Sequence, residues 1–127
     1  MTASEQSIIL NHMVEQRLQL DDVFHSLADG TRRDILRRTI VRDQTISELA
    51  ERYQMSFAAV AKHLTVLEKA QLITKRKEGR TQIISANKQT IDFAHEHLEK
   101  YEALWAERFN GIENLIQGEQ KYGERNI

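Results

Sequence analysis

The chain of 127 residues contains no cysteine and no proline. Without cysteine it can form no disulfide, and thiolate ligands for a metal ion are excluded. The absence of proline favours long uninterrupted helices, because proline inside a helix removes a backbone hydrogen bond and clashes with the preceding turn. We therefore expect long helices and no covalent cross-links.

Long apolar segments are missing as well. No run approaches the about 20 apolar residues of a membrane span, and the N-terminus lacks a basic segment followed by a hydrophobic one. A hydrophobic content of 40% over 127 residues suits one compact domain. We therefore expect a single cytoplasmic domain over 1–127, with no membrane partner and with frayed polar ends at 1–7 and 118–127.

The segment 45–81 carries the clearest local signals. Thr45 and Glu48 have the spacing of a capping box, which predicts that a helix begins there and that each side chain binds a free backbone N–H. The residues 54–55 make a turn, and Ser56 can cap a second helix. The apolar residues of this second helix recur every three or four positions: Val60, Leu64 and Leu67.

A basic hairpin follows the second helix. Strand-favouring residues at 72–74 and 81–85 flank the charged segment 75–80, in which Gly79 permits the positive φ of a tight turn. From 56 to 81 there are six Lys or Arg against two Glu, whereas the whole chain has a formal net charge of -1. This order of elements is typical of a winged helix-turn-helix, and the local positive charge suits a phosphate backbone. The alternative for the hairpin alone is a solvated charged surface.

Three segments resemble the ArsR/SmtB family of bacterial transcriptional repressors. They are Phe24–Leu36 (FHSLADGTRRDIL), Ile46–Ala50 (ISELA) and Val60–Ile73 (VAKHLTVLEKAQLI). The three segments occur in the order and at the separations of the family, and the resemblance extends from about Leu20 to Ile116. It implies a cytoplasmic DNA-binding regulator.

The resemblance implies a fold that is mainly α with a small β-hairpin. Residues 45–86 would form the DNA-binding motif and wing, and residues 88–117 a long C-terminal dimerisation helix. The chain departs from the family at Gly30, where proline is usual, and at Ala61, where serine commonly precedes the Lys-His pair. Gly30 makes the start of its helix less rigid and leaves Asp29 as the cap, whereas Ala61 removes one hydroxyl contact to DNA.

The last helix carries a long apolar stripe. Asn87 can cap this helix, which runs for about 30 residues or ~45 Å. A domain of this size cannot cover so long a stripe, so we infer a homodimer; the alternative is that the helix lies across its own core. The resemblance also points to dimerisation through the first and last helices. The expected interface residues are Val23, Leu98, Tyr101, Trp105, Phe109, Ile112 and Ile116.

Two such units about a two-fold axis would place their second motif helices in major grooves ~34 Å apart, which matches an inverted-repeat operator on double-stranded DNA. A dimer bound at a promoter would exclude polymerase, so repression is the expected sign. Phe57, Ala58 and Ala59 lack hydrogen-bonding side chains and can touch thymine methyl groups, so discrimination would depend in part on DNA shape. The candidate contacts are Ser56, Phe57, Ala58, Ala59, Lys62 and His63 on the helix, and Arg76, Lys77, Arg80 and Thr81 on the wing. His63 has an alternative role as a partly buried helix residue.

An effector cannot be read from the residues. Asp92, His95, His97 and Glu99 form a suggestive cluster, in which His95 and Glu99 lie one turn apart and could share a metal, whereas His97 points to a different face from either. We therefore assign no metal site and no cofactor, and release by a metal or a small molecule stays an alternative. The two exposed histidines would otherwise belong to a polar helix face.

Two other classes of function were weighed. No phosphate-binding glycine loop, nucleophile elbow or metallohydrolase motif occurs, so we expect no enzyme. A winged helix that binds a protein partner is the second alternative, since residues 88–127 carry eight Asp or Glu against five Lys or Arg. That reading predicts weak DNA binding that is insensitive to salt, whereas a repressor loses affinity steeply as salt rises.

Overall fold

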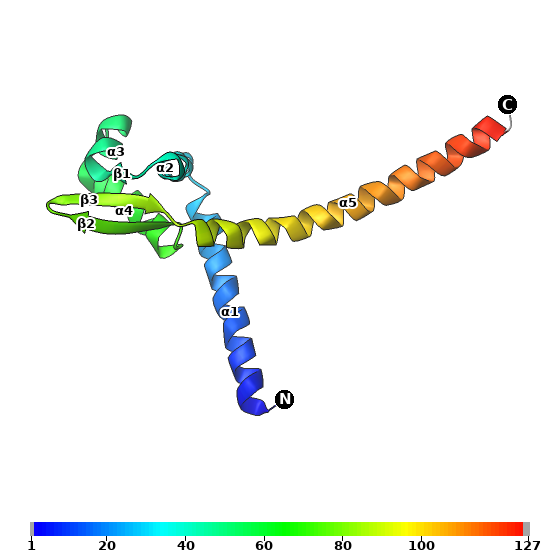
Figure 1. Cartoon of the computed structure of the whole chain (residues 1–127), viewed down its shortest axis with the longest axis horizontal. Helices are drawn as coiled ribbons and strands as arrows, with labels where there is room; N and C mark the ends of the chain where they lie inside the picture. Colours follow the sequence, from blue (N-terminus) through cyan, green and yellow to red (C-terminus); the bar gives the residue numbers. More distant parts are fainter. Residues whose placement is uncertain (1, 126–127) are drawn as a thin grey trace. The chain divides into compact units, whose positions relative to one another are not determined.

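The computed structural model describes the backbone of residues 2–125 and the side chains of residues 2–17 and 19–117. Its contacts divide the chain into two units, one up to Ile91 and one from Asp92 onward. The expectation of a frayed end at 118–127 falls outside the residues whose side chains are described. The elements, labelled in Figure 1, are α1 (Ala3–Ser26), α2 (Gly30–Val41), β1 (Gln44–Thr45), α3 (Ile46–Tyr53), α4 (Phe57–Lys69), β2 (Ile73–Glu78), β3 (Thr81–Ala86) and α5 (Lys88–Arg125).

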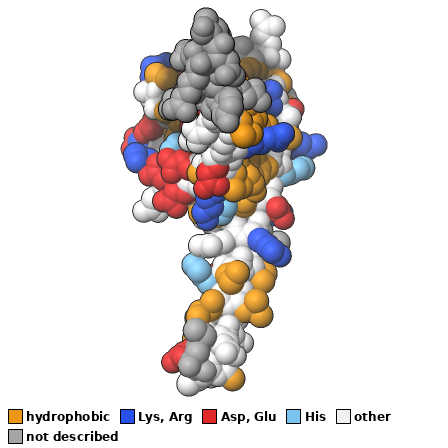
Figure 2. Space-filling model, turned by 90° about the vertical axis from the view of Figure 1, so that its right-hand side faces the viewer, with side chains coloured by type: hydrophobic (Ala, Val, Ile, Leu, Met, Phe, Trp, Pro, Cys, Tyr) orange, Lys and Arg blue, Asp and Glu red, His pale blue; other side chains and the backbone are white. Residues whose placement is uncertain are grey.

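The first helix begins earlier than the sequence indicated. The Thr2 hydroxyl accepts a hydrogen bond from the Glu5 N–H at 3.2 Å, and the Glu5 carboxylate accepts one from the Thr2 N–H at 3.0 Å. This capping box satisfies two backbone N–H groups, so the helix starts at Ala3 where we expected a frayed segment. Figure 2 shows apolar side chains along α1, in the lower part of the view. The exposed large ones are Ile8, Ile9, Leu10, Met13, Val14 and Phe24.

The helix-turn-helix forms with the expected caps. Asp29 accepts from the Arg32 N–H at 3.0 Å, Thr45 from the Glu48 N–H at 3.0 Å, and Ser56 from the Ala59 N–H at 3.2 Å. Gln54 ends α3 in the left-handed conformation, with φ of 53°, which reverses the chain into α4. The fold class is therefore confirmed for the motif that positions the reading helix.

Only the Thr45 half of the expected capping box forms among the described residues. The Glu48 carboxylate instead lies 3.6 Å from the guanidinium of Arg42. An exposed carboxylate can bind either a backbone N–H or a nearby cation. Here the segment before α3 places the cation of Arg42 close to Glu48. The cap on α3 therefore rests on one hydroxyl.

The hairpin belongs to a three-stranded antiparallel sheet in the order β1-β3-β2. Strand β1 has two residues and pairs Thr45 with Ile83, whereas β2 and β3 pair from Ile73↔Ala86 to Glu78↔Thr81. Gly79, with φ of +62°, lies in the turn between β2 and β3, where a side chain would be strained. The extra strand fastens the wing to the start of α3.

The core of the first unit lies between α2, α3, α4 and the sheet. Ile35 is fully buried and Leu36 is 9% exposed, but Ile40, which belongs to the same helix, is 56% exposed. Thr39 takes the buried position, because its hydroxyl donates to the Leu36 carbonyl at 2.8 Å and so leaves no unpaired polar atom. The other fully buried large apolar residues are Val23, Leu49, Val60, Leu64, Leu67, Leu72, Ile73 and Ile84.

The burial of Val23 corrects one expectation. Its side chain is 0% exposed within the single chain, so it has no surface left to offer to a partner. Val23 is a core residue of the first unit and not an interface residue.

Helix α5 has 38 residues, a length of about 57 Å. At its start the Asn87 side chain accepts from the Gln89 N–H at 3.2 Å, as expected of a cap. Every described side chain from 98 to 117 is exposed, and Trp105 and Phe109 stack on each other with ring centroids 5.4 Å apart. Among the described residues, no helix combines the length and apolar character that a membrane span requires.

Candidate nucleic-acid interface

Helix α4 has one side that packs into the core and another side, called here the α4 front, that is exposed to solvent. Its buried side, Val60, Leu64 and Leu67, is 0% exposed and packs into the core. The opposite side exposes Ala58 and Lys62, and Phe57, one turn before Val60 at the start of the helix, is 60% exposed. Because the helix is anchored by three core residues, its front is a rigid surface that can be inserted into a groove.

The wing charges fall into two groups. Arg76 lies 3.1 Å from Asp43 and 3.1 Å from Glu78, and it donates to the Ser85 hydroxyl at 2.8 Å. The hydrogen bonds to Glu78 and then to Asp43 raise the pKa of the Arg76 guanidinium. Arg76 is therefore neutralised locally and fixes the wing to the segment before β1.

Lys77 and Arg80 form the second group. Both are exposed, and among the described residues neither lies within ion-pair distance of a carboxylate. Lys62 on α4 is in the same situation. These three cations therefore supply positive charge that the protein itself does not neutralise.

A cleft joins the front of α4 to the tip of the wing. It has a volume of about 470 Å³, and four of the expected contact residues, Phe57, Ala58, Arg80 and Thr81, line it together. Ala61, whose position the family resemblance had placed at the DNA, also lines the cleft, and four further lining residues were not anticipated: Thr45, Ile46, Ser47 and Gln82. The sequence contained a signal for two of these cleft residues. Ser47 lies in the first turn of α3. Gln82 lies two residues before the buried Ile84, so the two side chains share one face of strand β3.

The remaining candidates on α4 have other partners. Ala59 is half-buried, and its backbone N–H is bound by the Ser56 hydroxyl. His63 has a side chain 22% exposed, with its Nδ1 3.9 Å from a carboxylate oxygen of Asp29. The alternative we gave for His63, a partly buried helix residue, describes its place in the fold.

A polar cluster holds α2 against α3. Tyr53 donates a hydrogen bond to the Asp34 carboxylate, which also accepts from Arg37 at 2.5 Å and from Arg38 at 2.8 Å. The Tyr53 hydroxyl, followed by the two guanidinium groups, holds the pKa of Asp34 well below its usual range. Burial, followed by the hydrogen bond to Asp34, raises the pKa of Tyr53 to about 12. The cluster stabilises the packing that sets the angle of the motif.

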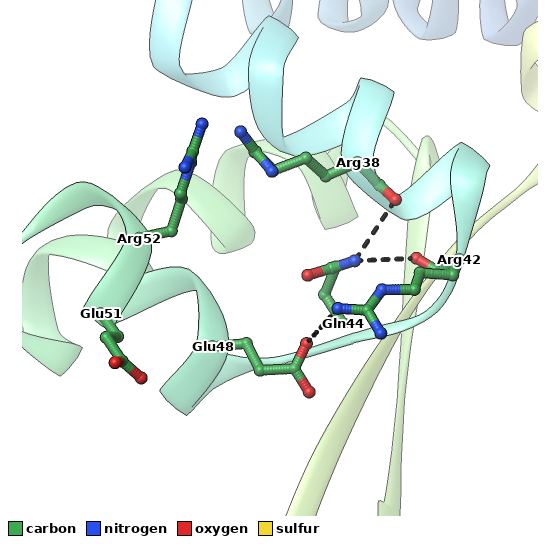
Figure 3. A pocket seen from close by; sticks show the side chains of 6 residues that line it. All are labelled: Arg38, Arg42, Gln44, Glu48, Glu51 and Arg52. Atoms are coloured by element: carbon green, nitrogen blue, oxygen red, sulfur yellow. Dashed lines mark hydrogen bonds and ion pairs between the residues drawn. The ribbon is translucent and has the colours of Figure 1, made fainter.

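A second pocket, of about 410 Å³, lies where α2, β1 and α3 meet (Figure 3). Gln44, which lines this pocket, is buried, and its side-chain amide donates hydrogen bonds to the backbone carbonyls of Arg38 at 3.5 Å and Arg42 at 3.3 Å. Three arginines and two glutamates line it, and one of these arginines is paired with Glu48 and another with Asp34. These ion pairs and the Gln44 hydrogen bonds hold α2, β1 and α3 together, so the pocket is part of the structural framework of the motif.

The metal-ligand cluster on α5 does not assemble in a single chain. In the part of the chain that the structure describes, no three His, Cys, Asp or Glu side chains converge on a point that could hold a metal ion. His95 pairs with Glu99 at 2.8 Å, and the Nδ1 of His97 lies 3.0 Å from the Phe93 carbonyl oxygen.

Comparison with known proteins decides the family. Residues 29–75 match the model of the bacterial regulatory proteins of the arsR family. The transcriptional regulator Rv2034 of Mycobacterium tuberculosis is 30% identical over 99 residues, which is 78% of this chain and 90% of that protein. The chain belongs to the ArsR family. The transcriptional repressor SdpR of Bacillus subtilis is 31% identical over 68 residues, which is 54% of this chain and 76% of the repressor.

The solved structures agree with this ArsR-family assignment. The ArsR-like transcriptional regulator from Rhodococcus sp. RHA1 is 33% identical with a TM-score of 0.66, over 78% of this chain and 93% of that chain. The family and the relatives are transcriptional regulators, so the chain is a DNA-binding regulator of transcription and not an enzyme. The winged helix-turn-helix, expected from the order of caps and hairpin, is confirmed.

Proposed function

We propose that this ArsR-family regulator is a homodimeric repressor that binds an inverted-repeat operator. The observation that carries the dimer is the apolar stripe of α5, which no described residue of the same unit covers. Its exposed large apolar residues are Leu98, Tyr101, Leu104, Trp105, Phe109, Ile112, Leu115 and Ile116, each at least 44% exposed.

The stripe is suited to a second copy of the chain. In proteins most of the stability of a helix comes from the packing of its apolar face and not from helix propensity. The stripe contains an aromatic pair, Trp105 and Phe109, and aromatic residues are enriched at the centres of interfaces. The guanidinium of Arg108 lies 5.3 Å from the Trp105 ring, which favours a ring orientation ready for contact.

The proposed DNA contacts are the front of α4 and the tip of the wing. Ser56, Phe57, Ala58 and Lys62 would meet the major groove, and Lys77, Arg80 and Thr81 the flanking backbone. Among these proposed contacts, Lys62, Lys77 and Arg80 are cations with no carboxylate within ion-pair distance in the described part of the chain, so they can release counterions from phosphates. We assign Arg76 a smaller direct share, since its charge is paired, and we place Ala59 and His63 behind the contact surface.

The test starts from a random library, because the operator is unknown. Duplexes with about 30 random base pairs, long enough for two half-sites one helical turn apart, would be enriched on the full chain. Fluorescence anisotropy would then compare the enriched duplex with a scrambled duplex at 50 and 200 mM salt. We expect binding that survives scrambled competitor and falls at least about tenfold between the two salt concentrations.

The enriched sequence itself tests the symmetry. An inverted repeat with half-site centres about 10 base pairs apart is the expected product. A single unrepeated site would contradict the dimer, and equal affinity for scrambled DNA would contradict sequence-specific regulation. Transcription from a promoter that carries the enriched site should fall when the protein is added, and a rise would contradict repression.

A further inference from the structure

The chemistry of the α4 front indicates what kind of base edge it reads. The residues that the α4 front turns toward the cleft are Phe57, Ala58 and Ala61, all apolar. The cleft is open to solvent on the side that would face DNA, and Phe57 keeps 60% of its surface exposed. A large exposed aromatic side chain at the start of a reading helix offers apolar surface that an apolar group of the DNA can cover.

The polar groups near this front are already engaged. The Ser56 hydroxyl accepts the Ala59 N–H at 3.2 Å, and the Thr65 hydroxyl donates to the Ala61 carbonyl at 2.9 Å. His63 is half-buried beside Asp29. In the first two turns of α4, all of whose residues are described, Lys62 is the one exposed charged side chain.

Helix α4 has few side chains that read purines by paired hydrogen bonds. Its sequence, FAAVAKHLTVLEK, contains no Arg, Asn or Gln. Guanine is read by Arg or Lys and adenine by Asn or Gln, each through two hydrogen bonds in the major groove, so Lys62 is the one exposed side chain of this kind in the first two turns of α4. The apolar feature of the major groove is the 5-methyl group of thymine, which side chains such as Phe and Ala contact directly.

We propose that Phe57, with Ala58 and Ala61, is the specificity-determining surface of the reading helix, and that it recognises thymine methyl groups in each operator half-site. This inference rests on the proposed function, because it requires that α4 enters the major groove. Lys62 then anchors the helix to the backbone without reading sequence. The polar side of the cleft, Arg80, Thr81 and Gln82, belongs to the wing and lies across from this apolar surface.

The experiment removes the methyl group alone. In the enriched duplex each thymine of one half-site is replaced in turn by 2′-deoxyuridine, which pairs with adenine in the same way and lacks only the 5-methyl group. We expect binding of the full chain to weaken about fourfold for each contacted methyl, the value of one buried methyl group. The loss should fall on a few adjacent positions and should be repeated in the other half-site.

Two variants connect the effect to its residue. Phe57→Ala should bring the ratio of thymine to deoxyuridine affinities close to one at one or more of these positions. Lys62→Ala is the matched control on the same helix, and it should weaken binding to both duplexes equally and reduce the salt slope. Phe57 is exposed, so Phe57→Ala should keep the far-ultraviolet circular dichroism and melting temperature of the parent protein.

The outcomes separate this inference from the function on which it rests. Sequence-specific binding that no deoxyuridine substitution weakens would overturn the methyl readout and leave the regulator intact. The same conclusion follows if the enriched half-sites contain no thymine, or if Phe57→Ala leaves the thymine preference unchanged. Failure to enrich any sequence would overturn both.

Discussion

The two units of the molecule obtain their stability in opposite ways. The unit up to Ile91 buries a dozen apolar residues in a core of its own, whereas none of the described side chains from 98 to 117 on α5 is buried. The first unit therefore has a core of its own, whereas the apolar stripe of α5 is left for the second copy that we propose. In the proposed dimer the labour is divided, because one unit presents α4 and the wing and the other provides assembly.

Truncation in the core should have the largest effect on stability. Leu64→Ala leaves a cavity beneath the reading helix and should lower the free energy of unfolding by about 2–5 kcal/mol. Urea unfolding followed by circular dichroism should show the same loss at low and at high protein concentration. Leu104, 62% exposed on α5, is the comparison: Leu104→Ala should cost more at high concentration, where the proposed dimer forms.

A charge placed in the α5 stripe should have the next largest effect. Trp105→Glu should weaken self-association by about 30-fold or more, since a central aromatic contributes about 2 kcal/mol or more to an interface. Sedimentation velocity over a dilution series measures this. Asn110→Asp adds the same charge on the opposite side of the helix and should leave the association unchanged. Equal behaviour of the two variants would remove the stripe from the interface.

The polar cluster between α2 and α3 should make the first unit sensitive to acid. The pKa of Asp34 is lowered in the folded state, so its contribution is present above the unfolded value of 3.8 and is lost as pH falls below it. Asp34→Asn should cost about 1.5–3 kcal/mol at pH 7. Urea titrations at several pH values should show this gap closing below about pH 4; a constant gap would contradict the assignment.

The smallest expected effect separates the two kinds of wing cation. In the proposed dimer, Arg80→Ala removes one phosphate contact from each copy and should reduce the slope of log affinity against log salt by about 2, about 1 for each contact. Arg76→Ala should change the slope less, because Asp43 and Glu78 already neutralise its charge. Anisotropy titrations of the two variants over a salt series give both slopes. A larger change for Arg76→Ala would mean that Arg76 leaves its ion pairs for DNA.

Much of the first unit could be predicted from the sequence because its signals are local. Thr45 and Ser56 each bind an N–H three residues on, and Gly79 needs only its own φ, so a short window of sequence contains the information. The order of the elements followed from the same local signals, and the family resemblance pointed to the same fold.

The features that were missed depend on residues far apart in the sequence. Strand β1 has two residues and exists through its pairing with β3, and Arg76 is neutralised by Asp43, 33 positions earlier. Thr39 is buried with its hydroxyl bonded to the Leu36 carbonyl, a contact that hydrophobicity does not reveal. The lining of the cleft could be anticipated only in part, since it combines α3, α4 and the wing.

Native mass spectrometry of the full chain on its enriched duplex tests the central claim most directly. The claim is that two copies, joined through α5, act together on one inverted repeat. With DNA in excess, we expect free duplex and duplex carrying two chains of 14.8 kDa each, with almost no complex of one chain. Accumulation of one-chain complexes before two-chain complexes would show that each winged helix binds alone, and would contradict the proposed dimer.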